Sequence, residues 1–150
     1  MSFAIPGYSL RSGSGLDRAL LVKFMQRTYQ ELYPGREFAH LARTVEQYLS
    51  AETSLWWVEA AATPIACLWL GNAVDQVTAD RHAYIFLLYV SPHHRHQGIG
   101  SALMSQAELW AKQRGDRQIG LQVFTHNQPA LNLYQKLGYQ TQSIWMVKQL

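Results

Sequence analysis

The most informative segment of the chain is Val90-Ser91-Pro92-His93-His94-Arg95-His96-Gln97-Gly98-Ile99-Gly100-Ser101. The run that leads into it, residues 83–90, is apolar throughout and carries aromatic and β-branched side chains, which predicts a strand buried on both faces. On the other side, apolar residues recur at helical spacing and predict a helix from about Gly98 to Arg114. A turn therefore joins the end of a buried strand to the beginning of an amphipathic helix.

This turn suits a phosphate group. The first N–H groups of a helix have no partner within the helix, and the helix dipole places a partial positive charge there. Gly98 and Gly100 lack side chains and allow close approach to the backbone, while Arg95 adds a fixed positive charge. A dinucleotide fingerprint would need glycine where Leu103 stands, and no Walker Gly-Lys-Ser/Thr occurs. From local residues alone, a plain strand-to-helix turn remains the alternative.

Strand-like and helical stretches alternate along the rest of the chain, which predicts one mixed α/β domain over residues 1–150. The elements expected from periodicity and turn residues are a strand at 3–10, helices at 16–33 and 38–49, strands at 54–61 and 64–70 joined around Thr63-Pro64, a polar loop at 72–80, a strand at 119–123, a helix at 127–137 and a last strand at 140–148. Asn127 is expected to cap the helix that follows it.

The composition is that of a chain that can fill a core, with 48% hydrophobic and 15% charged residues. Cys67 is the single cysteine, so no internal disulfide forms, and its apolar neighbours predict a core thiol. No run of 18 apolar residues or signal peptide is seen, so we expect a cytoplasmic protein without a membrane partner. The net charge of +3 comes without a Lys/Arg cluster, so a nucleic-acid partner is not expected.

Two motifs resemble those of the GNAT superfamily of N-acetyltransferases. Residues 95–100 resemble its Arg/Gln-x-x-Gly-x-Gly/Ala signature. A second set resembles its Asn-x-x-Ala-x-x-x-Tyr-x-Lys-x-Gly-Phe/Tyr pattern: Asn127, Ala130, Tyr134, Lys136, Gly138 and Tyr139. The resemblance covers roughly residues 82–147, and the first half of the chain agrees only in its order of helices and strands.

The resemblance implies an α+β fold of the acyl-CoA N-acyltransferase type. Its central twisted sheet would be mostly antiparallel, with about six to seven strands and about four flanking helices. The fourth and fifth strands would splay apart, and the pantetheine arm of acetyl-CoA would enter there like an added strand. The coenzyme-binding residues that the resemblance implies are Leu88, Tyr89, Val90, Arg95, His96, Gln97, Gly98, Ile99, Gly100, Ser101, Asn127, Ala130, Tyr134 and Lys136.

The implied reaction is direct attack by a primary amine, of a small molecule or a peptide, on the acetyl thioester through a tetrahedral intermediate. By the same resemblance, the backbone N–H of Leu88 would stabilise the oxyanion and Tyr134 would protonate the leaving thiolate, although a helical tyrosine is otherwise most often core packing. Many relatives carry a carboxylate on the strand before the turn, and none stands there in this chain. Glu59, His82 or a water chain are open as the base, and none is assigned.

Other residues leave alternatives. His93, His94 and His96 could bind a metal, but we expect them to line the coenzyme entrance, with no metal required. Six aromatic residues could wall an acceptor pocket or fill the core: Tyr29, Tyr33, Trp56, Trp57, Trp69 and Trp145. The stretch after Gly138 is short for two strands, so we expect a second subunit to complete an edge as a homodimer.

Two other functions compete with the acetyltransferase. The missing strand carboxylate motivates a non-catalytic acyl-CoA-binding sensor. The hypothesis of a small RNA-binding domain is supported only by the sequence pI near 9.1 and by scattered aromatic residues.

Overall fold

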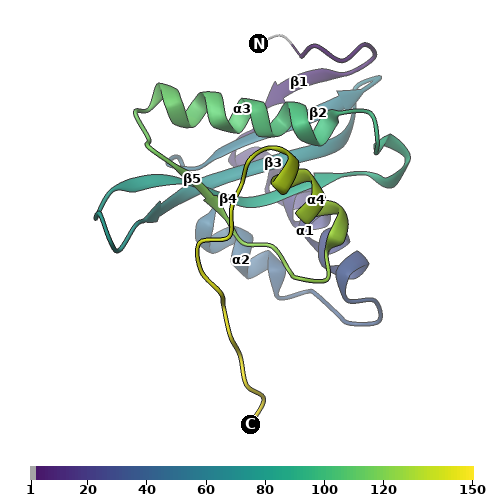
Figure 1. The fold of residues 1–150 in the computed structure, drawn as a ribbon. Helices are drawn as coiled ribbons and strands as arrows, with labels where there is room; N and C mark the ends of the chain where they lie inside the picture. The colour runs from purple at the N-terminus through teal and green to yellow at the C-terminus, as the bar shows by residue number, and fades with distance from the viewer. Residues whose placement is uncertain (1–2) are drawn as a thin grey trace.

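The computed structural model describes residues 3–150 (Figure 1). Its strands are β1 (Ser9–Ser12), β2 (Ser54–Ala60), β3 (Thr63–Val74), β4 (Arg81–Val90) and β5 (Ile119–Leu121). Its α-helices are α1 (Arg18–Leu32), α2 (Leu41–Tyr48), α3 (Ile99–Gln113) and α4 (Gln128–Lys136). Two short 3-10 helices precede α1 and α3, η1 (Gly15–Asp17) and η2 (Pro92–His94).

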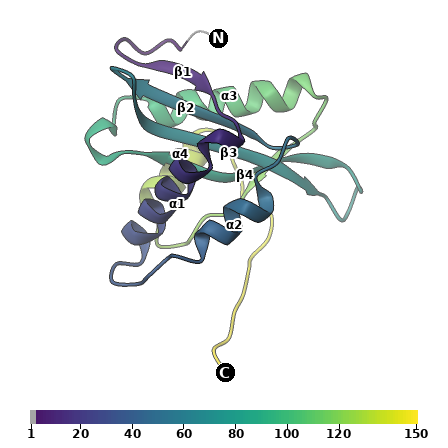
Figure 2. The ribbon, with the colours of Figure 1, turned by 180° about the vertical axis from the view of Figure 1, so that it is seen from behind.

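The strands form one sheet in the order β1-β2-β3-β4-β5. The first four strands are antiparallel to their neighbours, and β5 runs parallel to β4. Helices α1 and α2 cover one face, and α3 and α4 lie over the other, as the two opposite views show (Figures 1 and 2). The mixed α/β fold with a mostly antiparallel sheet and four α-helices agrees with the prediction, although five strands form where six to seven were expected.

Apolar residues at strand and helix periodicity build a core on each face of the sheet. On the first face, Leu21 and Phe24 of α1 pack with Trp57 and Tyr89 of the sheet. On the second face, the residues of α3 that recur at helical spacing are buried against β2, β3 and β4, namely Ile99, Leu103, Met104 and Ala107. With both faces covered, the thiol of Cys67 is fully buried, and this burial raises its pKa.

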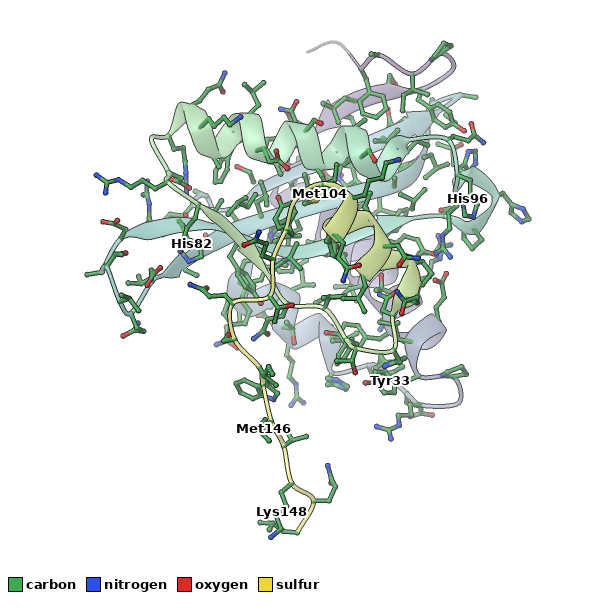
Figure 3. The ribbon with its side chains drawn as sticks, viewed as in Figure 1. Tyr33, His82, His96, Met104, Met146 and Lys148 are labelled. Carbon is green, nitrogen blue, oxygen red and sulfur yellow. The ribbon has the colours of Figure 1, made fainter. Side chains whose placement is uncertain are left out.

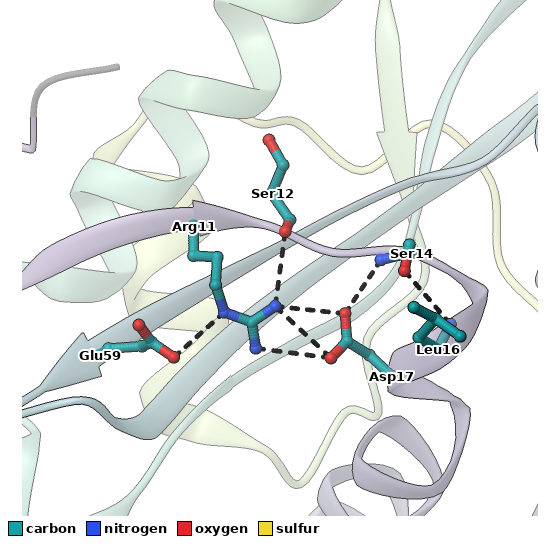
Figure 4. A network of polar contacts seen from close by, with 6 residues as sticks. All are labelled: Arg11, Ser12, Ser14, Leu16, Asp17 and Glu59. Atoms are coloured by element: carbon teal, nitrogen blue, oxygen red, sulfur yellow. Dashed lines mark hydrogen bonds and ion pairs between the residues drawn. The ribbon is translucent and has the colours of Figure 1, made fainter.

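A polar network fixes the first edge of the sheet (Figure 4). Arg11 of β1 contacts Glu59 of β2 at 3.1 Å and Asp17 of η1 at 3.3 Å. Asp17 also accepts from the N–H of Ser14, and the Ser14 hydroxyl accepts from the N–H of Leu16, which forms a capping box. The network ties the chain entering α1 to the β1–β2 pair.

The hairpin between β2 and β3 turns two residues earlier than predicted. Ala60 pairs with Thr63, so the loop consists of Ala61 and Ala62, whose φ angles are +50° and +66°. Two positive φ values match the right-handed twist of the flanking strands in a two-residue loop. Pro64, expected in the turn, lies inside β3 next to Ile65, the extra residue of a bulge in β3 opposite Val58 and Glu59, where a missing N–H is tolerated.

Three other expectations change. The first strand covers only Ser9–Ser12. The polar loop narrows to 75–80, because β3 continues to Val74 and β4 begins at Arg81. The last strand, expected at 140–148, does not form, since no sheet edge runs beside this segment, which leaves the domain as an extended arm (Figure 1). None of the helices within residues 3–150 has the length and hydropathy that a membrane crossing requires.

Candidate functional site

The sheet opens between β4 and β5. The two strands pair only at the start of β4, where Ala83 to Ile85 face Ile119 to Leu121. Beyond Ile85, no strand of the described chain pairs with β4 on this side. The N–H of Ser91 donates to Ile65 on the β3 side, and backbone groups alternate along a strand, so those of Val90 and Leu88 face the opening. Both residues are among the coenzyme-binding residues that the resemblance implies.

The turn after β4 leaves a row of backbone donors free. Gly98 caps α3 with a φ of +83°, and His96 also takes a left-handed φ of +63°. Within the described chain, the N–H groups of residues 96–101 donate to no protein acceptor, and the first bond into α3 runs from Ala102 to the carbonyl of Gly98. Free N–H groups at a helix N-terminus form an anion site.

Side chains of the turn are fixed by the N-terminal segment. The Tyr8 hydroxyl donates to Oε1 of Gln97 at 3.1 Å and lies 2.8 Å from Nδ1 of His94. The Gln97 side chain therefore points toward Tyr8. Figure 3 shows His96 of the same turn at the right-hand side of the view. Among residues 3–150, no three His, Cys, Asp or Glu side chains converge as metal ligands would.

The side chain of Arg95 is engaged with protein groups. Its Nη2 lies 2.7 Å from Oε2 of Glu31 in α1, and its Nε donates to the carbonyl of Val90 at 2.7 Å. The guanidinium also lies 5.5 Å from the ring centroid of Tyr89, whose hydroxyl donates to Glu31. Burial, followed by this contact with Glu31, raises the pKa of Tyr89 to about 12. Arg95 thus links α1 to the turn, and an anion would meet mainly backbone donors.

A cavity of about 730 Å³ joins these features. Of the predicted coenzyme-binding residues, the cavity is lined by all except Gln97: Leu88, Tyr89, Val90, Arg95, His96, Gly98, Ile99, Gly100, Ser101, Asn127, Ala130, Tyr134 and Lys136. The structure therefore brings together two motifs that lie about thirty residues apart in the chain, although their roles stay predictions.

Helix α4 forms the wall opposite the turn. The side chain of Asn127 caps it by accepting from the N–H of Ala130 at 3.4 Å. A Cβ on Gly100 would lie 3.3 Å from Cδ2 of Leu133, so the glycine allows α3 and α4 to approach closely here. Burial raises the pKa of Tyr134 from the ordinary value of 10.0 to about 12, so the phenol keeps its proton to a higher pH than an exposed tyrosine does. Among the described residues, no protein group bonds to that hydroxyl.

Several lining residues were not anticipated from the sequence. They come from α1 and from the region around the start of α4: Thr28, Glu31, Leu32, His126, Pro129 and Leu133. Among the described residues, Glu31 is the only carboxylate that lines the cavity, and it reaches the site because α1 packs on β4. An aromatic group continues from this end of α1, since Phe124 contacts Tyr29 and Tyr33, and Tyr33 contacts His126. No pattern in the sequence pointed to Glu31.

The structure excludes four of the six aromatic residues that were candidates for the wall of an acceptor pocket. Trp56, Trp57 and Trp69 are buried in the core rather than in an acceptor pocket, and Trp145 lies on the exposed arm. Their size and apolar surface fill the two faces of the sheet, which is the commoner role of tryptophan. Tyr29 and Tyr33 remain near the cavity.

Neither of the two residues that were left open as the base, Glu59 and His82, lines the cavity. Glu59 is paired with Arg11 at the β1–β2 edge. His82 lies near the opposite end of β4 from the turn, buried, with Nδ1 2.8 Å from the carbonyl of Ala83 (Figure 3). The carboxylate that could serve the site is Glu31.

Comparison with known proteins agrees with this geometry. Residues 21–139 match the profile of the Acetyltransferase (GNAT) family. The chain is 34% identical over 78 residues to an uncharacterized N-acetyltransferase of Methanocaldococcus jannaschii, a match covering 52% of this chain and 33% of that protein. It is 32% identical over 82 residues to an uncharacterized N-acetyltransferase of Bacillus subtilis, covering 55% and 52%. The matches thus span about a third to a half of these curated relatives.

Solved structures share the whole fold. A putative acetyl transferase from Pyrococcus furiosus superposes with a TM-score of 0.78 at 25% identity, covering 95% of this chain and 99% of that one. A GCN5-related N-acetyltransferase from Ralstonia eutropha gives 0.75 at 25% identity, covering 96% and 99%. The fold is therefore that of acetyltransferases. The chain belongs to the GNAT family, as the two motifs predicted.

Proposed function

We propose that the protein is an N-acetyltransferase that moves the acetyl group of acetyl-CoA to a primary amine of a small molecule or peptide. One observation carries the proposal: the free N–H groups of His96 and of residues 98–101 line the same cavity as the unpaired edge of β4. The first feature suits a diphosphate, and the second suits the amide-bearing pantetheine arm. A structural relative from Clostridium acetobutylicum was crystallised with acetyl-CoA, and it shares this fold with a TM-score of 0.78 at 21% identity over 95% of this chain and 96% of that one.

The residues fit this ligand along its length. The diphosphate would accept bonds from the N–H groups that precede and begin α3. The pantetheine arm would extend along β4 and bond to the backbone of Val90 and Leu88. It would take the place of a neighbouring strand on the side where β5 no longer pairs with β4. Arg95 already donates to the Val90 carbonyl, which leaves that oxygen one further lone pair. The thioester would then lie near Leu88 and Tyr134.

The chemistry follows from the groups at that end. The amine nitrogen attacks the acetyl carbon, a C–N bond forms, and the C–S bond breaks. The N–H of Leu88 would bond to the carbonyl oxygen as it gains negative charge. Tyr134, whose phenol is protonated at neutral pH, would give a proton to the departing sulfur and regain one from solvent. The amine loses its own proton to solvent or to a carboxylate, and the products are an amide and free coenzyme A.

The amine would approach from the α1 side of the opening. Glu31 is the carboxylate on this side, and Tyr29, Tyr33, Phe124 and His126 lie close by. A carboxylate attracts an ammonium group, and aromatic faces stabilise it by cation–π contact. We propose that Glu31 receives the acceptor's cationic amine after Arg95 moves away. Two aminoglycoside acetyltransferases from soil metagenomic samples are among the structural relatives, at 15% and 20% identity, a likeness of fold only.

The test is a thiol-release assay with acetyl-CoA against a panel of amines, alongside calorimetric binding of coenzyme A. The proposal expects coenzyme binding and release of thiol with at least one amine. Tight binding without turnover on any amine, unchanged by Tyr134→Phe, would instead identify a non-catalytic sensor. Absence of coenzyme binding would exclude both.

The proposal also covers the cellular location and the oligomeric state of the protein. Acetyl-CoA is a metabolite of the cell interior, so we place the reaction in the cytoplasm. We also propose a homodimer, as the sequence led us to expect, because an apolar segment of the chain extends from the domain into solvent.

A further inference from the structure

The turn before α3 holds an unfavourable backbone conformation without main-chain bonds from its own N–H groups. His96 takes a left-handed φ of +63°, which a residue with a Cβ adopts only where its surroundings hold it. Within the described chain, the N–H groups of residues 96–101 donate to no protein acceptor. These are the donors that suit a diphosphate, so contacts from another part of the molecule must keep them in place.

A side-chain bond ties this turn to the N-terminal segment. Among residues 96–101, Gln97 is the only one whose side chain forms a hydrogen bond within the described chain, and its Oε1 accepts from the hydroxyl of Tyr8 at 3.1 Å. That hydroxyl has one proton, so its oxygen accepts from Nδ1 of His94, which lies 2.8 Å away. Tyr8 therefore contacts the turn on both sides of Arg95.

The segment that carries Tyr8 is itself anchored by packing. Phe3, Ile5 and Tyr8 are partly buried against the core between α3 and the sheet, and the N–H of Tyr8 donates to the carbonyl of Ile5 at 3.2 Å. A Cβ on Gly98 would lie 4.0 Å from Cδ1 of Ile5, so the segment passes beside the start of α3. The ring of Tyr8 meets that of His94 edge to face at 5.6 Å. Apolar packing thus sets the position of the hydroxyl.

We propose that Tyr8 is a positioning residue for the coenzyme. By holding Gln97 and His94, it keeps the N–H groups of residues 96–101 in their observed places before the coenzyme binds. A site whose donors are already oriented loses less conformational freedom on binding, so it binds more tightly. The side chain of Gln97 then serves the coenzyme by anchoring the turn. This inference rests on the proposed coenzyme site, but it does not depend on which amine is acetylated.

The first test removes the hydroxyl and keeps the ring. In Tyr8→Phe, the Kd for coenzyme A in calorimetry should rise roughly 10-fold, which is about what one hydrogen bond contributes. The KM for acetyl-CoA should rise by a similar factor, while kcat at saturating acetyl-CoA should change less than about 2-fold. Tyr48→Phe is the matched control and should change none of these values, because its half-exposed ring contacts Phe86 and its hydroxyl bonds to no protein group in the described chain.

A double-mutant cycle tests whether Tyr8 acts through the turn. Gln97→Met keeps the length of an exposed side chain and removes its acceptor, so it should weaken coenzyme binding in the same direction. The double variant should bind little more weakly than Tyr8→Phe alone, because both changes break the same bond. Losses that multiply in the double variant would show that the two residues act separately and would contradict the positioning role.

The imidazole of His94 gives a readout that needs no coenzyme. Nitrogen NMR at mildly alkaline pH should show the ring proton on Nδ1 in the unaltered chain and a shift toward the Nε2–H form in Tyr8→Phe. Circular dichroism should show every variant folded. An unaltered chain that binds no coenzyme A would overturn the proposed function and the role of Tyr8 with it. A chain that binds coenzyme A with the same Kd before and after Tyr8→Phe would overturn this inference alone.

Discussion

Nη2 of Arg95 lies 2.7 Å from Oε2 and 3.0 Å from Oε1 of Glu31, which joins helix α1 to the turn before α3 across the cavity. The pair brings Glu31, the only carboxylate among the described residues that line the cavity, next to the guanidinium of the turn before α3. Both side chains keep more than a third of their surface in solvent, so the pair adds little stability. What the ion pair contributes is the position of the two charged groups at the cavity.

Glu31→Gln should therefore separate function from stability. The free energy of unfolding in urea should fall by less than about 1 kcal/mol, as for other exposed ion pairs. The value of kcat/KM for the amine should fall at least roughly 10-fold, because the amide no longer attracts an ammonium group. Glu46→Gln on the exposed side of α2 is the matched control and should change neither. Unaltered amine kinetics in Glu31→Gln would refute the role of Glu31.

Tyr134→Phe should lower kcat while the KM for acetyl-CoA stays nearly constant. The change removes one hydroxyl from a side chain that lines the cavity and bonds to no protein group in the described chain. General acid catalysis is typically worth roughly 10²–10⁴-fold, which sets the expected loss. Tyr139→Phe is the control, because its hydroxyl donates to Glu108 at 3.2 Å outside this cavity. Equal losses in the two variants would argue for packing alone.

The pH dependence of the rate follows from the pKa of Tyr134. Burial raises it to about 12, so the phenol keeps its proton while the amine loses its own. The rate should rise with pH as neutral amine accumulates, and Tyr134 should cause no decline until the pH approaches about 12. A decline between about pH 8 and about pH 10 that disappears in Tyr134→Phe would contradict this assignment.

Stability should respond to the same group at higher pH. The folded-state pKa lies above the ordinary tyrosine value of 10.0, so the folded chain holds this proton more tightly than the unfolded chain. The contribution is complete below about pH 10 and is lost as the pH rises toward about 12. Urea titrations should show a smaller loss of stability over this interval in Tyr134→Phe than in the unaltered chain.

Gly100→Asp should abolish binding of coenzyme A. The new side chain begins 3.3 Å from Leu133 and carries a negative charge at the N-terminus of α3, where the diphosphate would lie. Gly15→Asp is the control, since a Cβ there meets no atom within 4 Å. Circular dichroism should show both variants folded. Normal coenzyme affinity in a folded Gly100→Asp protein would contradict the assigned site.

The residues that line the cavity around the turn could be predicted, because the features that place them there are local. Glycines, a strand end and a helix start within residues 90–101 specify free donors, and Tyr134 follows from a second local motif. Glu31 could not be predicted in this way. It lies 64 residues before Arg95, and the two meet only because α1 packs against β4. Distances of this kind come from tertiary packing, which leaves no pattern at either position.

In the fold too, features set by local sequence could be predicted, and features that depend on tertiary contacts could not. Apolar periodicity predicted the helices, because a buried face is set by the helix's own sequence. The prediction of a last strand at 140–148 was wrong for a different reason. Residues 144–147 have the side chains of a strand, but a strand needs a neighbour to bond to, and that partner is not specified by the segment itself.

The β2–β3 hairpin supports a final prediction, on stability. Ala61 and Ala62 both take a left-handed φ, which costs a residue with a Cβ roughly 1 kcal/mol or more. Glycine adopts this conformation freely, so Ala62→Gly should stabilise the fold by roughly 0.5–1 kcal/mol in urea denaturation. Ala42→Gly in helix α2 is the same change at an ordinary helical φ, and it should destabilise by up to about 1 kcal/mol. Destabilisation by Ala62→Gly would show that the flexibility of glycine in the unfolded chain outweighs the strain that the substitution removes.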